Sequence, residues 1–246
     1  GNNFFTVGEV YGYNIVDKKD YDFGARKVDY FATAFNALIN FDFRNEAKQK
    51  YEPLYAKYSA ILHNDLKGYS VMNYVSSHDD ASPYDKKREK PMESATKLLL
   101  APGISQVYYG DESARSLDIP GTEGDATLRP FMNWDAIQNN LLTKEVLAHW
   151  SRLGKFRANH PAVGAGTHQL ISSSPYSFSR SLTKGIYTDK VVIGLELTKG
   201  NKSILVGNIF ANGENVRDAY SGKTAVVKNG TITIDTDYEI LLIEKL

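Results

Sequence analysis

The sequence contains no cysteine among its 246 residues, which excludes disulfides, thiolate zinc sites and a cysteine nucleophile. It also lacks a charge imbalance, because 29 Lys and Arg residues offset 29 Asp and Glu residues. Electrostatic attraction to nucleic acid or to an anionic membrane surface is therefore absent. No run approaches the roughly 20 apolar residues of a membrane span. We expect neither a nucleic-acid partner nor a membrane span.

Hydrophobic residues make up 42% of the chain and charged residues 24%, an ordinary globular composition with room for one large or two modest domains. Short apolar runs alternate with amphipathic stretches over the first two thirds, as is typical of βα units with a parallel sheet. Strands are expected at residues 4–10, 38–43, 70–75 and 104–109. Helices are expected at residues 26–37, 45–65, 92–100 and 143–159.

The pattern changes from about Pro161 onward, where short Val, Ile, Leu and Tyr runs are separated by Gly, Asn and Asp turns. The pair Asn229–Gly230 is a strong hairpin signal. Strands are expected at residues 176–182, 191–197, 203–210, 224–227, 231–234 and 239–243. The sequence therefore predicts two domains, 1–160 and 161–246, of which the second is an all-β antiparallel sandwich.

Four parallel strands cannot close a barrel, and an open half would leave sheet edges and an apolar face in water. We interpret the first domain as the second half of a (β/α)8 TIM barrel, strands 5–8, completed by four βα units from the remainder of a parent chain. The active site of such a barrel lies at the C-terminal ends of its strands. The residues that follow each predicted strand are therefore the candidate functional residues.

Carboxylates follow two of these strands. The first strand delivers Glu9, and partial desolvation there would suit a carboxylic acid to protonate a leaving oxygen. The third strand runs into Ser77, His78 and Asp79, a group able to bind sugar hydroxyls and to hold negative charge near an oxocarbenium ion. Taken alone, Glu9 is better explained as a solvated or salt-bridged glutamate, whereas a His–Asp loop pair without a ligand explains His78 and Asp79 equally well.

The order of the motifs resembles the α-amylase family of glycoside hydrolases, and the resemblance spans the whole chain. Gly-Glu-Val-Tyr comes first, a strand ending in His-Asp follows, and Pro-Gly then leads to the strand end Tyr-Tyr-Gly-Asp-Glu. The resemblance implies that Glu9 is the general acid/base and that Asp79 is the carboxylate that stabilises the transition state. It implies substrate binding by His78, Asp125 and Arg129, with Tyr11 as a secondary, aromatic candidate.

Two departures from the family pattern affect these roles. The family usually has asparagine directly before its His-Asp, where this chain has Ser77, so one hydrogen bond near the substrate is expected to be rearranged. The motif with the nucleophilic aspartate is not in this sequence, and the family's calcium ligands lie mostly in the same upstream part. We therefore assign no metal or cofactor to this chain, although calcium is possible upstream, and expect the chain alone to be catalytically incomplete.

The resemblance implies retaining hydrolysis of α-1,4-glucosidic bonds in an α-glucan such as starch, or in a maltooligosaccharide. An α-glucosidase, a cyclomaltodextrinase or a transglycosylase shares the same carboxylates and stays an alternative. A non-catalytic carbohydrate-binding or interaction scaffold is an alternative from another class. A polymeric substrate favours an exported location: periplasmic, cell-surface or secreted.

Overall fold

A computed structural model describes residues 4–246 of the chain. By its internal contacts the chain divides into two compact units, Gly1–Ser151 and Arg152–Leu246. This division falls inside helix α6 (Leu141–Asn159), whereas the boundary predicted from the sequence lies between residues 160 and 161. The first three residues of the predicted 1–160 domain lie outside the described residues, and the predicted bounds stay a prediction.

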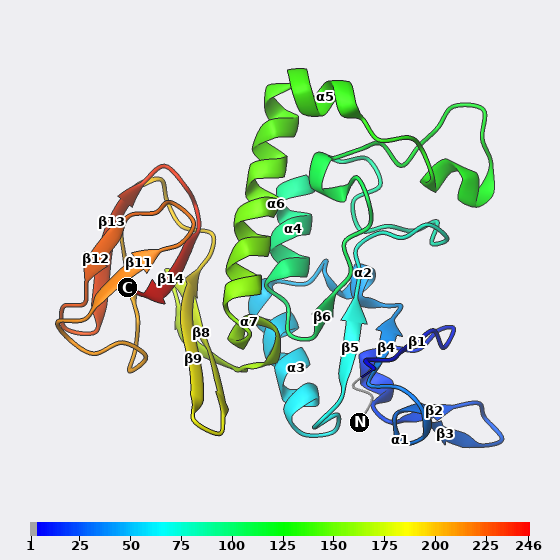
Figure 1. Cartoon of the computed structure of the whole chain (residues 1–246), viewed down its shortest axis with the longest axis horizontal. Coiled ribbons are helices and arrows are strands. Elements are labelled where there is room, and N and C mark those ends of the chain that lie inside the picture. The colour runs from blue at the N-terminus through cyan, green and yellow to red at the C-terminus, as the bar shows by residue number, and fades with distance from the viewer. Residues whose placement is uncertain (1–3) are drawn as a thin grey trace. The chain divides into compact units, whose positions relative to one another are not determined.

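A four-stranded parallel sheet forms the centre of the first unit (Figure 1). In spatial order its strands are β1 (Val7–Gly8), β4 (Ala37–Asn40), β5 (Ser70–Asn73) and β6 (Ile104–Ser105). The four predicted strands are confirmed, and each ends earlier than its apolar run. Because all neighbouring pairs are parallel, the C-terminal ends of the four strands lie along one edge of the sheet.

Three of the four predicted helices are confirmed. The prediction at 45–65 corresponds to two helices, α2 (Phe43–Glu46) and α3 (Tyr51–His63), separated by a turn. The prediction at 92–100 corresponds to α4 (Pro91–Leu99), which starts with a proline at its first position, where the missing N–H costs nothing. The prediction at 143–159 corresponds to α6. The loop before α6 also contains η2 (Asp111–Ser113), η3 (Gly124–Leu128) and α5 (Trp134–Asn139).

The predicted helix at 26–37 is wrong. The chain instead forms η1 (Ile15–Asp17), an antiparallel hairpin of β2 (Asp20–Asp22) with β3 (Lys27–Asp29), and the short helix α1 (Tyr30–Thr33). The hairpin turn is built by Asp22, whose carboxylate accepts the Gly24 N–H at 2.6 Å. Gly24 has φ +81°, a backbone conformation that glycine adopts without strain. The turn folds residues 27–29 back onto β2 as a strand, so a helix begins only at Tyr30, where the Asp29 side chain caps it.

Buried asparagines tie together the strand ends. Asn40 and Asn73, the last residues of β4 and β5, are fully buried. Asn40 Nδ2 donates to Asn73 Oδ1 at 2.9 Å, and Asn73 Nδ2 donates to the Pro102 carbonyl at 2.9 Å. Buried amides with satisfied hydrogen bonds specify register, because an alternative alignment would leave them unpaired. These contacts position the loops that leave β4, β5 and β6.

The second unit is an antiparallel β-domain of two sheets. A six-stranded sheet has the order β12-β11-β14-β9-β8-β7, and β10 pairs with β13. The elements of this unit after α6 are α7 (Ala162–Ala165), β7 (Thr167–Ser173), β8 (Tyr176–Lys184), β9 (Tyr187–Gly194), β10 (Gly200–Leu205), β11 (Asn215–Asp218), β12 (Thr224–Val226), β13 (Thr231–Thr236) and β14 (Leu241–Lys245).

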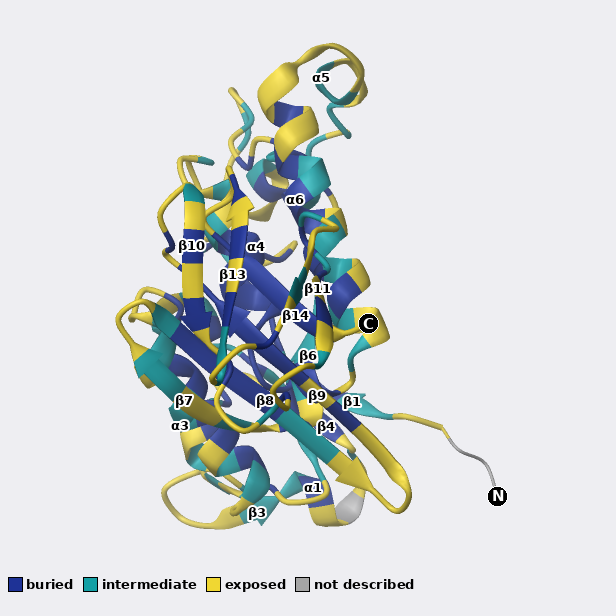
Figure 2. Ribbon diagram, turned by 90° about the vertical axis from the view of Figure 1, so that its left-hand side faces the viewer, coloured by how far each residue is buried: buried dark blue, intermediate teal, exposed yellow. Residues whose placement is uncertain are grey.

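One apolar core joins the two sheets. It contains Val192 of β9, Ile204 of β10, Val216 of β11, Ile232 of β13 and Ile243 of β14. Buried and exposed residues alternate along β10 and β13 (Figure 2), as expected for strands with one face on the core. The six strands predicted from the sequence are confirmed, while β7 and β11 were not predicted because both are rich in polar residues.

The Asn229–Gly230 turn is also confirmed. Both residues have positive φ, +49° and +69°, and Lys228 and Thr231 exchange two backbone hydrogen bonds across them. This is the geometry of a type I′ turn, which matches the twist of the adjoining chain. The strands that flank it belong to different sheets, β12 to the six-stranded sheet and β13 to the pair with β10.

Asp218 stabilises the second unit. Its fully buried carboxylate accepts hydrogen bonds from the N–H groups of Tyr220, Ser221 and Leu242.

We expect Asp218→Ala to lower the free energy of unfolding of this unit by about 3 kcal/mol, because buried donors lose their acceptor. Amide hydrogen exchange of β11 and β14 measures the effect. Asp237→Asn, a change on an exposed aspartate of the same unit, serves as the control, and equal protection in both variants would contradict this role.

Candidate active site

The His78–Asp79 pair lies on the loop that leaves β5. Both side chains face water, with 60% of the His78 side chain and 41% of the Asp79 side chain exposed. The Ser77 hydroxyl donates to Asp79 Oδ1 at 2.8 Å, and His78 Nε2 lies 3.7 Å from Asp79 Oδ2. One carboxylate oxygen is therefore held by the protein itself, while the other lies beside an exposed imidazole.

Arg129 contacts this pair through the backbone. Its Nε donates to the His78 carbonyl at 2.9 Å, and its Nη2 lies 3.5 Å from Asp125 Oδ2. Both side chains of the Arg129–Asp125 pair are about half exposed. The structure thus brings together four of the six predicted site residues, His78, Asp79, Asp125 and Arg129, although they come from two loops separated by more than 40 positions in the sequence.

Glu9 follows β1 directly and is exposed. Among the described strands of this sheet, β1 lies at the edge with β4 as its neighbour. The partial desolvation expected of Glu9 at the mouth of a complete barrel stays a prediction. Since β4 separates β1 from β5, Glu9 and the His78–Asp79 pair leave the same edge of the sheet two strands apart. Their convergence on one substrate stays a prediction.

Aromatic rings link the ends of β1 and β5. The Tyr11 side chain is 86% exposed, and its ring packs edge-on against Phe41 with centroids 5.7 Å apart. Phe41, which follows β4, packs in turn against Tyr74 at 6.3 Å. Such edge-to-face contacts are favourable aromatic geometries. Tyr11 therefore lies at the edge of the sheet from which the candidate residues project.

Asp80 anchors the loop that follows β5 to residues next to β4. Arg44 Nε lies 2.6 Å from Asp80 Oδ2, and the Tyr74 hydroxyl donates to the same oxygen at 2.8 Å. Burial, followed by the hydrogen bond to Asp80, raises the pKa of Tyr74 well above its usual value, so the phenol stays protonated and remains a donor. This contact fixes the residue directly after Asp79.

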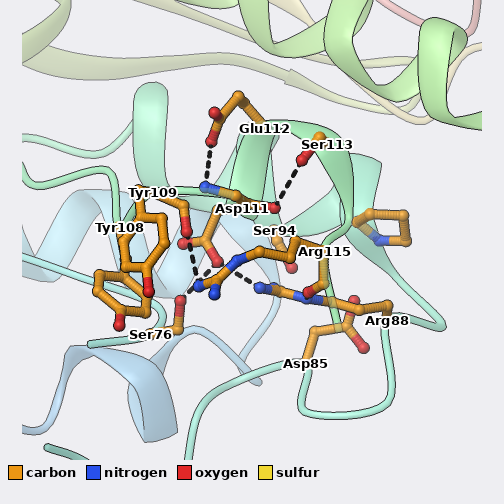
Figure 3. Close-up of polar contacts among 12 residues, drawn as sticks. Ser76, Asp85, Arg88, Ser94, Tyr108, Tyr109, Asp111, Glu112, Ser113 and Arg115 are labelled. Carbon is orange, nitrogen blue, oxygen red and sulfur yellow. Dashed lines mark hydrogen bonds and ion pairs between the residues drawn. The ribbon is translucent and has the colours of Figure 1, made fainter. Parts of the chain in front are cut away.

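A buried cluster anchors the loop on the β6 side (Figure 3). The carboxylate of Asp111 is fully buried, and its Oδ1 accepts hydrogen bonds from the Ser76 hydroxyl at 2.6 Å and from Arg88 Nη2 at 2.7 Å. Arg88 Nε also donates to the Arg115 carbonyl at 2.8 Å. In the sequence, Asp111 is a member of the family motif Tyr-Tyr-Gly-Asp-Glu. Its position after a predicted strand is the signal in the sequence that indicates a role at the site.

Gly110 is required where the chain turns into this cluster. Its φ is +89°, and a Cβ at this position would lie 2.2 Å from Arg115 Nε, so any side chain would displace Arg115. The Arg115 guanidinium packs on the Tyr109 ring at 3.9 Å and donates through Nη2 to the Tyr109 carbonyl at 2.7 Å. A buried arginine with stacked and hydrogen-bonded contacts is costly to move. The Tyr-Tyr-Gly-Asp-Glu motif therefore folds as a rigid support.

Within residues 4–246, no group of three or more His, Cys, Asp or Glu side chains has the arrangement of a metal site. The helices of the same range include none with the length and apolarity needed to cross a membrane.

Comparison with known proteins places this arrangement in a family. The periplasmic α-amylase of Escherichia coli is 33% identical over 180 residues, which cover 72% of this chain and 24% of that protein. The amylopullulanase of Thermoanaerobacter thermohydrosulfuricus is 24% identical over 256 aligned residues, which cover 85% of this chain and 17% of that protein. No family model matches the chain.

Solved structures show the same fold. The α-amylase of Geobacillus thermoleovorans, in a complex with acarbose, superposes with a TM-score of 0.67 at 17% identity over 100% of this chain and 54% of that chain. AmyP in complex with maltose superposes with a TM-score of 0.60 at 14% identity over 97% of this chain and 55% of that chain.

A parallel sheet with acidic residues at its strand ends, followed by an antiparallel β-domain, is thus the fold that this chain shares with the α-amylase structures. The chain is a member of the α-amylase family, as its motifs predicted. It spans about a quarter of the first curated relative and about half of the solved structures it matches.

Proposed function

We propose that this chain supplies the acid/base residue and the transition-state carboxylate of a retaining enzyme that hydrolyses α-1,4-glucosidic bonds in starch or maltooligosaccharides. One observation carries the proposal: Glu9 and the exposed His78–Asp79 pair follow β1 and β5, which are separated only by β4 in a parallel sheet. A retaining glycosidase works with an acid/base carboxyl group and a nucleophilic carboxylate at the same bond. Of these two, this chain would supply the acid/base group, and Asp79 would be an additional carboxylate near that bond.

In the proposed reaction, Glu9 in its acid form protonates the glycosidic oxygen as the bond from that oxygen to the anomeric carbon breaks. A carboxylate nucleophile forms a bond to the anomeric carbon, and the leaving sugar departs with the proton from Glu9. Water then attacks the anomeric carbon while Glu9 takes its proton, and the nucleophile is released. Asp79 holds sugar hydroxyls and stabilises the positive charge that develops on the ring.

The proposal places the nucleophile outside this sequence. The family motif that contains the nucleophilic aspartate has no counterpart among the 246 residues. The matched solved structures are about twice as long as this chain, which supports a second half-barrel as its source. The same arrangement would pair the open edges of the parallel sheet, which are otherwise exposed to other chains.

The names of the relatives support the substrate and the location that we propose. One curated relative is a periplasmic α-amylase, and one matched structure is a complex with maltose. We infer an α-glucan substrate and an exported enzyme from these similarities. The Arg129–Asp125 pair beside His78 is the proposed contact for a neighbouring glucose unit.

Proton NMR of the earliest product tests the proposed function. We expect the complete enzyme that contains these residues to release maltooligosaccharides from starch with the α-anomer formed first, because double displacement retains the configuration. The 246-residue chain alone is expected to release none. Early accumulation of the β-anomer, or robust starch hydrolysis by the chain alone, would contradict the proposed mechanism.

A further inference from the structure

We infer that Ser77 is a positioning residue that orients the Asp79 carboxylate toward the substrate. This inference rests on the role proposed for Asp79. Ser77 occupies the position where the α-amylase family usually has asparagine, so its contacts are those of this chain and not of the family pattern.

The hydroxyl of Ser77 holds the Asp79 side chain in one orientation. It donates to Asp79 Oδ1 at 2.8 Å, and the Asp79 N–H approaches the same hydroxyl oxygen at 3.4 Å. Together the two contacts close one small ring that contains the Cα–Cβ bond of Asp79 and so restricts rotation about this bond. With Oδ1 engaged, Oδ2 is the oxygen left beside His78, 3.7 Å from Nε2.

The backbone that carries Ser77 is itself held by the neighbouring serine. Ser76 and Ser77 are both buried, 1% and 6% exposed, yet their hydroxyls reach different partners. Ser76 donates inward to Asp111 Oδ1, which also accepts from Arg88. Arg88 adopts φ +57°, a left-handed conformation that costs a residue with a side chain about 1 kcal/mol or more. Strain of this kind occurs where the surrounding contacts enforce a functional geometry.

The loop is fixed on the other side of Asp79 as well. Asp80 is bound by Arg44 and Tyr74, so the residues before and after the His78–Asp79 pair are both anchored. The rotation of the Asp79 side chain is then the remaining freedom at the carboxylate, and Ser77 is the residue that removes it. A misplacement of about 1 Å in a catalytic group can lower the rate by about 100-fold.

The different partners of the two serines allow a positioning role of Ser77 to be distinguished from a purely structural one. Asp79 is partly exposed, so water can replace the hydroxyl of Ser77, and Ser77→Ala is expected to leave thermal stability unchanged. Ser76→Ala, in contrast, should affect stability, because it removes one of the two hydrogen-bond donors that reach the buried Oδ1 of Asp111. That variant is expected to lower the melting temperature.

The first measurement uses the complete enzyme that contains these residues and does not depend on turnover. Three-bond NMR couplings about the Cα–Cβ bond of Asp79 report its rotamer. We expect a single rotamer in the wild type and in Ser77→Thr, which keeps the hydroxyl, and averaged couplings in Ser77→Ala. The control is Ser82→Ala, a change on an exposed serine of the same loop, which should leave the couplings unchanged.

The second measurement uses the complete enzyme with starch and an aryl maltoside. Ser77→Ala is expected to lower kcat by about 10- to 100-fold, with KM within about threefold, because orientation matters most in the transition state. Ser77→Thr should restore most of kcat, and Ser82→Ala should match the wild type.

The inference is overturned if Ser77→Ala keeps a single Asp79 rotamer, if its kcat equals that of the wild type, or if its melting temperature falls and threonine fails to restore kcat. A wild-type enzyme that is inactive on α-glucans would refute the proposed function instead. In that case the couplings alone decide whether Ser77 orients Asp79.

Discussion

Replacing Glu9 by glutamine is expected to lower starch turnover by the complete enzyme by about 10²–10⁴-fold, the loss that follows removal of general acid catalysis. Glutamine preserves the shape of the side chain but cannot donate a proton to the leaving oxygen. The substitution removes the charge and the acidic proton without changing the volume of the side chain. The fold should therefore tolerate it.

A substrate with an activated leaving group shows whether the loss is specific to proton donation. An aryl maltoside has a good leaving group that needs little protonation, so its glycosylation step should suffer much less than that of starch. The measurement is kcat/KM for both substrates in the wild type and in Glu9→Gln. Glu145→Gln, the same change on an exposed glutamate of α6, serves as the control. Equal losses on both substrates, or no loss on starch, would show that Glu9 is not the acid.

Asp79→Asn is expected to lower kcat by about 10²–10³-fold, the scale found when one group that stabilises a transition state is removed. The amide keeps an oxygen that can accept the Ser77 hydroxyl, now held at 2.8 Å by Oδ1. The orientation of the side chain is therefore preserved while its negative charge is lost. The effect should appear in kcat, since the charge on the sugar ring develops only in the transition state.

Steady-state kinetics of Asp79→Asn and Ser77→Ala together distinguish the effect of the Asp79 charge on the rate from the effect of the Asp79 orientation. The Asp79 variant should lose more activity and should not be rescued by any change at Ser77. Asp118→Asn, on an exposed aspartate of the same unit, is the matched control. Wild-type kcat in Asp79→Asn would remove Asp79 from the mechanism, and a loss that appears only in KM would assign it to substrate binding alone.

Local patterns predicted most, but not all, of the helices and strands of the chain. Alternation of apolar runs with amphipathic stretches predicted β1, β4, β5 and β6, because burial of a parallel strand demands a short continuous apolar run. Turn residues predicted the Asn229–Gly230 turn, whose positive φ values are a property of those two residues themselves. The helix predicted at 26–37 is wrong, because the turn at Asp22 and Gly24 folds residues 27–29 back as a strand.

The sequence by itself determined the strand order along the chain, the residues at the strand ends and the motifs shared with the α-amylase family. Only the tertiary structure decided which contacts hold those residues in place. Ser76 donates a hydrogen bond to Asp111, Arg129 donates one to the His78 carbonyl, and Arg44 forms an ion pair with Asp80. These partners lie about 35 to 50 positions apart in the sequence. Hydrophobic periodicity reports which face of a segment is buried, whereas contacts between distant loops depend on the register of the sheet and on the paths of the loops, which no local pattern encodes.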